Sequence, residues 1–170
     1  HQAVTEQRRQ SRGSSQQSQQ SQEPQRLKDL QDMIDQLFNA VFVVRYRDVW
    51  PDLRALCIES LGQWVANFSA VMMDTQYVKY LGWALHDQKA QVRLEAVRAL
   101  TGLYEKNEFL QQLDKFTTRF QDRIGALPDD KDTNVAVAGI RMCLLLARAE
   151  KLSEEHVHHI YQLVYDRLDD

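Results

Sequence analysis

The chain has 170 residues, of which 44% are hydrophobic and 26% are charged, and its net charge is −3. These values suit one globular domain or part of a larger protein, and they exclude the strongly basic balance typical of nucleic-acid-binding domains, although a local basic patch stays possible. No apolar run approaches the ~20 residues that a membrane span needs, and no stretch of these residues has the pattern expected of a signal peptide. Cys57 and Cys143 lie in apolar helical patterns, which predicts reduced core thiols of an intracellular protein.

Residues 1–24 are mostly Gln, Ser and Arg and offer almost nothing to bury. Such a segment cannot offset the entropy lost on ordering, so we expect disorder. A tether or loop is favoured over a Gln-rich interaction tract. From residue 25 to 170 the pattern is helical, and because the chain begins with His1 and ends inside a helical pattern we expect a piece of a longer chain.

Apolar residues at three- and four-residue steps predict successive helices, and no β-alternation interrupts them. Pro51 suits the first turn of one helix, Asp74 can cap another, and Ser153 can cap the last. In chain order the predicted helices are 24–48, 51–68, 75–87, 89–107, 108–127, 132–150 and 153–170.

Three of these helices can be superposed with Leu53, Val92 and Val135 as a common origin. Apolar or small residues recur four, five, eight and eleven positions later, and an Asp precedes each copy (Asp48, Asp87, Asp130). Arg follows the origin in two copies, as Arg54 and Arg93, whereas the third copy has Ala136. Steps of 39 and 43 residues fall near the repeat length of HEAT or armadillo arrays. The sequence therefore predicts an all-α, HEAT-repeat-like α-solenoid of antiparallel helix pairs and favours it over a four-helix bundle.

The helix predicted at 75–87 carries two large aromatic residues away from its apolar stripe. At about 100° per residue, Val78, Leu81, Gly82 and Leu85 share the stripe, while Tyr80 and Trp83 lie roughly opposite it with Lys79 alongside. Another helix could cover these rings; alternatively, they form a partner site, since Trp and Tyr are enriched at binding hot spots. Two further stretches pair cations with rings, Arg45–Asp48 (RYRD) and Thr117–Phe120 (TTRF).

No pattern indicates catalysis. His156, His158 and His159 form the best candidate metal site, but a zinc site needs three or four ligands in good geometry, and a solvated helical face is the simpler interpretation. There is no Gly-rich phosphate loop and no activated Ser or Cys. We expect no enzymatic activity and no cofactor.

Several stretches together resemble a known family. FVVRYRD, LRALCIESLGQW, YVKYLGWALHD, VRLEAVRALTGLY, FTTRFQDRI and VAVAGIRMCLLL follow one another in order from about residue 38 to 165. They resemble the stromalin conservative domain of the stromal antigen family, the HEAT-repeat accessory subunit of cohesin.

This resemblance implies a non-enzymatic scaffold in the nucleus, associated with chromatin. It implies binding to the kleisin subunit of cohesin, to aromatic-x-aromatic motifs of insulator, release and cohesion-protector proteins, and to DNA, in support of sister-chromatid cohesion. By motif matching, the peptide site would use Tyr46, Arg47, Lys79, Tyr80, Trp83, Arg119 and Phe120. Candidate DNA contacts are Lys79, Arg93, Lys115 and Arg123.

Two alternatives stay open at this stage. One is a HEAT segment of another scaffold, such as a transport or translation factor, in which Trp83 fills a seam between helices. The other is DNA binding as the main role, which the net acidic charge does not favour.

Overall fold

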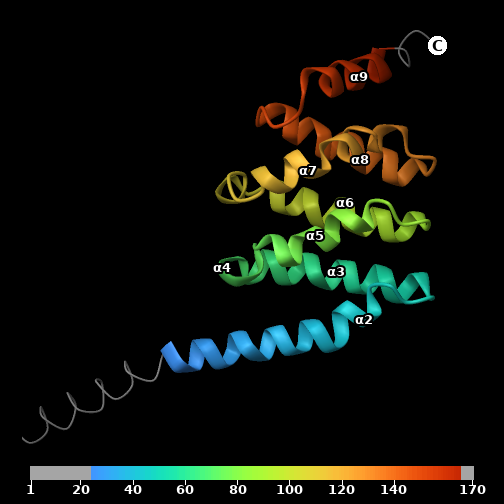
Figure 1. Ribbon diagram of the computed structural model, residues 1–170. Coiled ribbons are helices and arrows are strands. Elements are labelled where there is room, and N and C mark those ends of the chain that lie inside the picture. Colours follow the sequence, from blue (N-terminus) through green and yellow to red (C-terminus); the bar gives the residue numbers. More distant parts are fainter. Residues whose placement is uncertain (1–23, 166–170) are drawn as a thin grey trace, which may run out of the picture. The chain divides into compact units, whose positions relative to one another are not determined.

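The computed structural model describes residues 24–165, and these are helical with no strand among them. The segment expected to be disordered, residues 1–24, lies outside this range except for Pro24, which is the first helical residue. Figure 1 shows the elements in chain order. After a helix at 24–37 come η1 (Phe38–Phe42), α2 (Val43–Arg45), α3 (Pro51–Asn67), α4 (Ser69–Met72), α5 (Thr75–Ala84), α6 (Ala90–Tyr104), η2 (Asn107–Phe109), α7 (Asp114–Gly125), η3 (Leu127–Asp129), α8 (Thr133–Arg148) and α9 (Glu154–Tyr165).

The chain divides into two compact units at Val44 and Arg45. The first unit holds the helix at 24–37, which passes through the π-helical turn η1 into α2. Phe38 and Phe42 stack within that turn, with ring centroids 4.7 Å apart, and both are buried. The single helix predicted at 24–48 is therefore interrupted by a π-helical turn and ends at Arg45.

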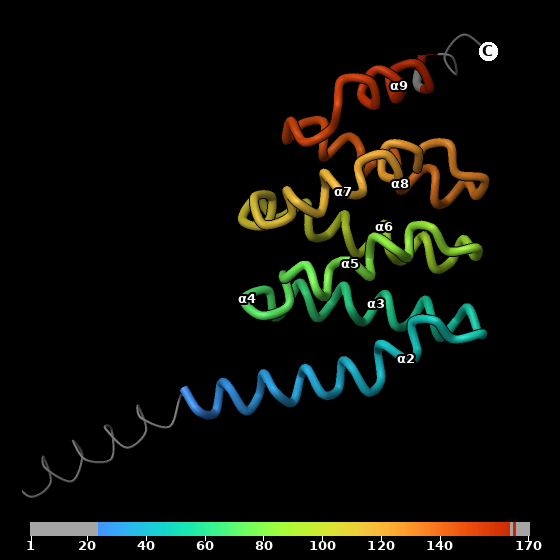
Figure 2. Tube along the Cα trace, viewed as in Figure 1, coloured from blue at the N-terminus to red at the C-terminus, as the bar shows by residue number. Residues whose placement is uncertain are grey.

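The second unit, from Arg45 onward, is an array of helix pairs. Its longer helices α3, α6 and α8 pack side by side, α6 between the other two, while α5 packs on α3, α6 and α7. The chain runs back and forth through this array and advances from green to red in Figure 2. The predicted α-solenoid is confirmed. No helix within residues 24–165 is long and apolar enough to cross a membrane.

The superposed repeat positions form the core of this unit. Leu61, Leu100 and Cys143, which occupy the position eight residues after the origin, are each 0% exposed. Val92 and Val135 are equally buried at the origin, but Leu53, their counterpart in α3, is 40% exposed. The origin of the repeat is therefore a core position in α6 and α8 but not in α3.

The recurrent Asp and Arg residues form a ladder between repeats. Arg54 donates Nε and Nη2 to the two carboxylate oxygens of Asp87, each at 2.8 Å. One repeat later, Arg93 binds Asp130 in the same way, at 2.8 and 2.6 Å. Each Asp also accepts the backbone N–H two residues on, which holds the turn before the next helix. The sequence recurrence thus reflects an inter-repeat ion-pair ladder.

Element boundaries differ from prediction in a second region. The single helix expected at 108–127 is instead the short η2, a turn, and α7, which starts at Asp114. Phe109 and Leu113 flank this break and are buried, so burial of both side chains outweighs helix continuation there. The predicted Asp74 cap is confirmed, since its Oδ1 accepts the Gln76 N–H at 2.8 Å.

Candidate functional site

Three aromatic rings meet where the turn after α2 approaches α5. The ring centroids of Tyr46 and Tyr80 lie 4.7 Å apart, and those of Tyr80 and Trp83 lie 5.1 Å apart, both edge to face. Edge-to-face packing of this kind is favourable beyond the area it buries. We call Tyr46, Arg47, Lys79, Tyr80 and Trp83 the aromatic face.

Two cations lie over these rings. The Arg47 guanidinium carbon is 5.0 Å from the Tyr46 ring centroid. Lys79 Nζ lies 5.2 Å from the centroid of Tyr80 and 5.6 Å from that of Trp83. Among the described residues neither cation forms an ion pair, so both charges can meet an acidic ligand.

Exposure differs sharply between the two rings of α5. Trp83 is 38% exposed, whereas Tyr80 is only 8% exposed. Burial raises the pKa of the Tyr80 hydroxyl, with a further rise from neighbouring Tyr46. Of the two alternatives that the sequence left open, cover by other parts of the chain holds for Tyr80, because Tyr46 and Trp83 pack against it. The helical periodicity placed Tyr80 off the apolar stripe, but it could not reveal that a turn from another part of the unit lies over it.

Arg119 and Phe120, the predicted site residues of α7, differ from each other in exposure. Phe120 packs against the Cα of Gly82 in α5, where a methyl group would collide with its ring. Phe120 is buried and also contacts Phe116, with ring centroids 4.7 Å apart. The Arg119 guanidinium carbon lies 5.6 Å from the Phe120 ring centroid. Arg119 is exposed, so of this pair the arginine is the one available at the surface.

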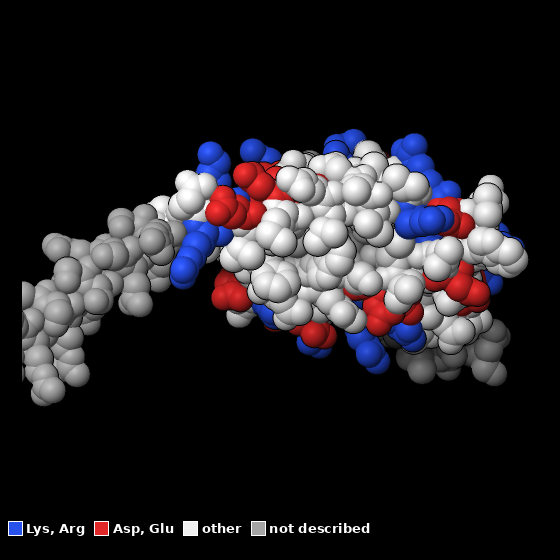
Figure 3. Space-filling view, turned by 90° about the horizontal axis from the view of Figure 1, so that it is seen from below, with Lys and Arg blue, Asp and Glu red and all other residues white. Residues whose placement is uncertain are grey.

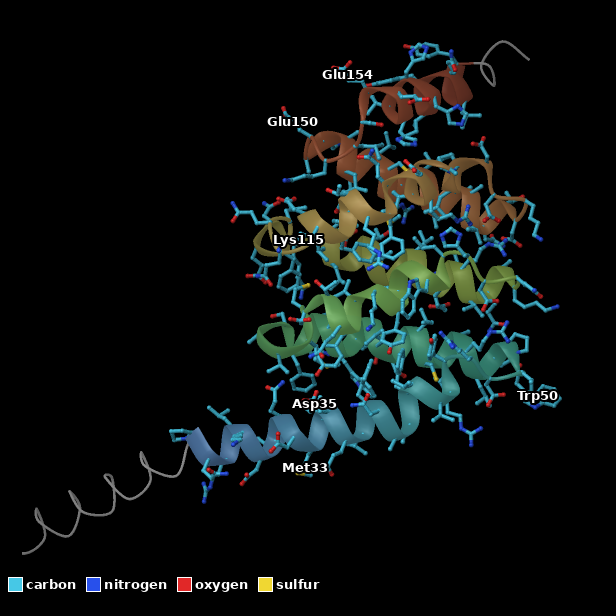
Figure 4. The ribbon with its side chains drawn as sticks, in the orientation of Figure 1. Met33, Asp35, Trp50, Lys115, Glu150 and Glu154 are labelled. Carbon is cyan, nitrogen blue, oxygen red and sulfur yellow. The ribbon has the colours of Figure 1, made fainter. Side chains whose placement is uncertain are left out.

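The candidate DNA contacts fall into two groups. Arg93 is 3% exposed and bound to Asp130, and Arg123 donates to the Leu85 carbonyl and to Asp130. Their guanidinium groups are engaged inside the repeat array, and Arg93 is the less exposed of the two. Lys115 is exposed near the start of α7 (Figure 4), and Lys79 is half-buried. On the face shown in Figure 3, basic side chains are scattered among acidic ones.

The histidines of α9 have partners other than one another. His159 Nε2 lies 2.7 Å from Asp129 Oδ2, and His156 Nδ1 lies 2.6 Å from the Ser153 hydroxyl. His158 instead lies 3.0 Å from Gln162. Within residues 24–165 no three His, Cys, Asp or Glu side chains are grouped so that they could hold a metal ion.

Sequence reasoning did not connect Arg54 and Asp87 with the aromatic face. Arg54 also donates Nη1 to the Asp48 carbonyl at 2.8 Å, and Asp48 lies two residues after Tyr46. The recurrence of Asp and Arg was a visible signal, but a recurrence alone does not say which copies pair. The pairing crosses from one repeat to the next, which the fold decides.

Comparison with known proteins gives a consistent result. The family model "Stromalin conservative domain" matches residues 47–121. The chain is 41% identical over 134 residues to cohesin subunit SA-1 of Xenopus laevis, covering 78% of this chain and 11% of that protein. It is 39% identical to putative STAG3-like protein 2 of Homo sapiens, covering 62% of this chain and 78% of that protein.

A solved structure agrees in fold. Residues 88–1035 of the cohesin subunit Scc3 from Z. rouxii match with a TM-score of 0.66 and 24% sequence identity. The match covers 75% of this chain and 14% of that one. The chain thus spans about a ninth of the length of the full cohesin subunits that it resembles.

Proposed function

Because this chain belongs to the stromalin conservative domain family, whose members include the non-enzymatic cohesin SA and Scc3 subunits, we propose that it is a scaffold segment that recruits partners to cohesin. In this role it binds the kleisin subunit, presents the aromatic face to short regulator peptides and contributes weak contacts to DNA. It acts in the nucleus, on chromatin, in support of sister-chromatid cohesion.

The aromatic face carries this proposal. Trp83 keeps 38% of its surface exposed although it is a large apolar side chain on a well-packed helix. Burying that surface under a partner would be favourable at roughly 25 cal/mol per Å². The rings suit an aromatic anchor of a peptide, and Arg47 and Lys79 suit its acidic residues. The preferred ligand is therefore a short segment of the form aromatic-x-aromatic with acidic neighbours.

Exposure also argues against the alternative in which Trp83 only fills a seam between helices. A seam residue would be as buried as Tyr77 or Leu81, which are 2% and 0% exposed. Tyr80 behaves more like those residues, so its contribution to a partner is to support Trp83 and Tyr46 from beneath. Trp83, with Arg47 and Lys79, makes the direct contacts in this proposal.

Titration calorimetry with a Phe-x-Phe or Tyr-x-Phe peptide tests the proposal on the kleisin-bound chain. Replacing a hot-spot tryptophan by alanine costs at least ~2 kcal/mol of binding free energy, so Trp83→Ala should weaken the peptide's affinity about thirtyfold. Trp50→Ala is the matched control, because Trp50 is 67% exposed, makes no ring contact with Tyr46, Tyr80 or Trp83 among the contacts of the described residues, and points away from the ribbon (Figure 4). Equal affinity of the folded Trp83→Ala chain and the unaltered chain would reject the site.

A further inference from the structure

The two segments that make up the aromatic face are joined by one arginine. Tyr46 and Arg47 lie on the turn before α3, whereas Lys79, Tyr80 and Trp83 lie on α5. Arg54, in the first turn of α3, bonds to both segments. Its Nη1 donates to the Asp48 carbonyl at 2.8 Å, and its Nε and Nη2 hold the carboxylate of Asp87, which follows α5.

The hydrogen bonds of Arg54 lie close in sequence to Tyr46 on one segment and to Trp83 on the other. Asp48 is two residues beyond Tyr46, and Arg54 Nη1 also approaches the Val49 carbonyl at 3.4 Å. On the α5 side, the Asp87 N–H donates to the Ala84 carbonyl at 3.1 Å and the His86 N–H donates to the Trp83 carbonyl at 3.1 Å. The backbone of Asp87 is thus fixed to the last turn of the helix that carries Trp83, and its carboxylate is the group that Arg54 holds.

The planar guanidinium group of Arg54 is suited to this set of bonds. Three guanidinium nitrogens bind two carboxylate oxygens and a carbonyl oxygen from different segments at once. A lysine ammonium is a point charge with rotatable donors and does not reproduce that geometry. The side chains of Arg54 and Asp87 are 15% and 16% exposed, so solvent screens their interaction little.

We propose that Arg54 and Asp87 are positioning residues of the aromatic face. The pair holds the turn with Tyr46 and Arg47 against α5, so that the Tyr46 ring covers Tyr80 and Trp83 keeps one side at the surface. The effect of Arg54 and Asp87 on peptide binding rests on the proposed function. Their effect on the placement of the Tyr46, Tyr80 and Trp83 rings does not, because it can be measured without a ligand.

The next rung of the ladder supplies a matched control. Arg93 donates Nε and Nη2 to Asp130 and Nη1 to the Asp87 carbonyl at 2.8 Å, which reproduces the bonds of Arg54 one repeat later. Its side chain is 4% exposed, so its loss perturbs the fold at least as much. Within the described residues, Arg93 makes no hydrogen bond to the turn that carries Tyr46.

The test compares Arg54→Gln, Arg54→Lys and Arg93→Gln in the full chain. Circular dichroism first checks that each variant is folded, and Arg54→Lys keeps a charge beside Asp87 in case the glutamine variant unfolds. Nuclear Overhauser contacts between the Tyr46 and Tyr80 rings, 4.7 Å apart, and the indole N–H shift of Trp83 then report the cluster directly. We expect both Arg54 variants to lose the ring contacts and shift the indole signal. Arg93→Gln loses a bond to the Asp87 carbonyl but leaves the Asp87 carboxylate bound to Arg54, so we expect it to keep the ring contacts and the indole signal.

Peptide titration with the same variants gives the functional readout. Arg54→Gln should bind the Phe-x-Phe peptide about tenfold more weakly than the unaltered chain, and Arg93→Gln should bind it equally. Intact ring contacts in the Arg54 variants, or lost contacts with unchanged peptide affinity, would overturn the positioning role. If the unaltered chain binds no peptide, the proposed function fails, and the ring contacts alone still decide whether Arg54 positions the cluster.

Discussion

The carboxylate of Asp130 binds two arginines of the repeat array. Its carboxylate accepts hydrogen bonds from Arg93 and Arg123 and from the backbone N–H of Asp132. Burial by itself would raise its pKa, but the hydrogen bond from Arg93, with the others, lowers the pKa of Asp130 from 3.8 to about 2. The charged form is therefore the one that the folded state favours.

This shift predicts a pH dependence of stability. A carboxyl group whose pKa is depressed on folding stabilises the protein above its unfolded pKa, and the contribution is lost as the pH falls through the folded one. For Asp130 the loss should occur from about pH 3.8 down to about 2 and amount to roughly 2 kcal/mol of unfolding free energy. Urea denaturation at a series of pH values measures it.

The matched control for this measurement is Asp130→Asn. Asparagine keeps the shape but has no proton to gain, so the variant should be less stable at neutral pH and flatter below pH 3.8. If both proteins lose stability equally between those pH values, other carboxyl groups cause the acid sensitivity.

At the scale of elements, the contact between α5 and α7 depends on the absence of one side chain. A Cβ at Gly82 would overlap the Phe120 ring, and that ring is buried against Phe116. Glycine costs a helix interior about 1 kcal/mol relative to alanine, so close packing is the physical reason for its presence here. Helical periodicity places Gly82 on the apolar stripe of α5, and the structure shows that the Phe120 ring packs there.

Gly82→Ala should therefore destabilise the chain although alanine is the better helix former. Overpacking costs ~1–3 kcal/mol, and the helix preference offsets about 1 kcal/mol of it, which leaves a net loss of up to ~2 kcal/mol in unfolding free energy. Thermal or urea denaturation gives the value.

Gly102→Ala in α6 is the control for that substitution, because a Cβ there meets nothing within 4 Å. It should stabilise the chain by up to ~1 kcal/mol. A stabilising Gly82→Ala would show that Phe120 can move aside without cost, contrary to the packing described.

At the scale of the whole molecule, charge limits the contact with DNA. The chain carries a net charge of −3, and two of the four basic residues considered for DNA are held inside the repeat array. Lys79 and Lys115 are left as candidates. Two phosphate contacts would give weak binding whose logarithmic dependence on salt has a slope of about −2.

Gel-shift titration of duplex DNA at several salt concentrations measures both quantities. We expect a shift only at low salt, and we expect Lys115→Ala to weaken it and reduce the slope by about one. Arg93→Gln is not expected to change the slope, provided that the variant is folded. Tight binding at physiological salt would instead make DNA the main ligand of this chain.

The sequence by itself determined the helical composition and the repeat. The steps between Leu53, Val92 and Val135 came from apolar periodicity, which is a local property because residues on one helix face recur every three or four positions. The same periodicity placed Trp83 off the core stripe, and its partial exposure confirms that reading.

Only the tertiary structure decided what lies over each of those faces. Arg93 and Lys79 look alike in sequence as basic residues on helices, yet one is buried against an aspartate 37 residues away and the other lies over two rings. Tyr80 is covered by Tyr46, which reaches it from a separate turn. The physical reason is that burial and ion pairing depend on neighbours supplied by other repeats, and helical periodicity carries no information about those neighbours.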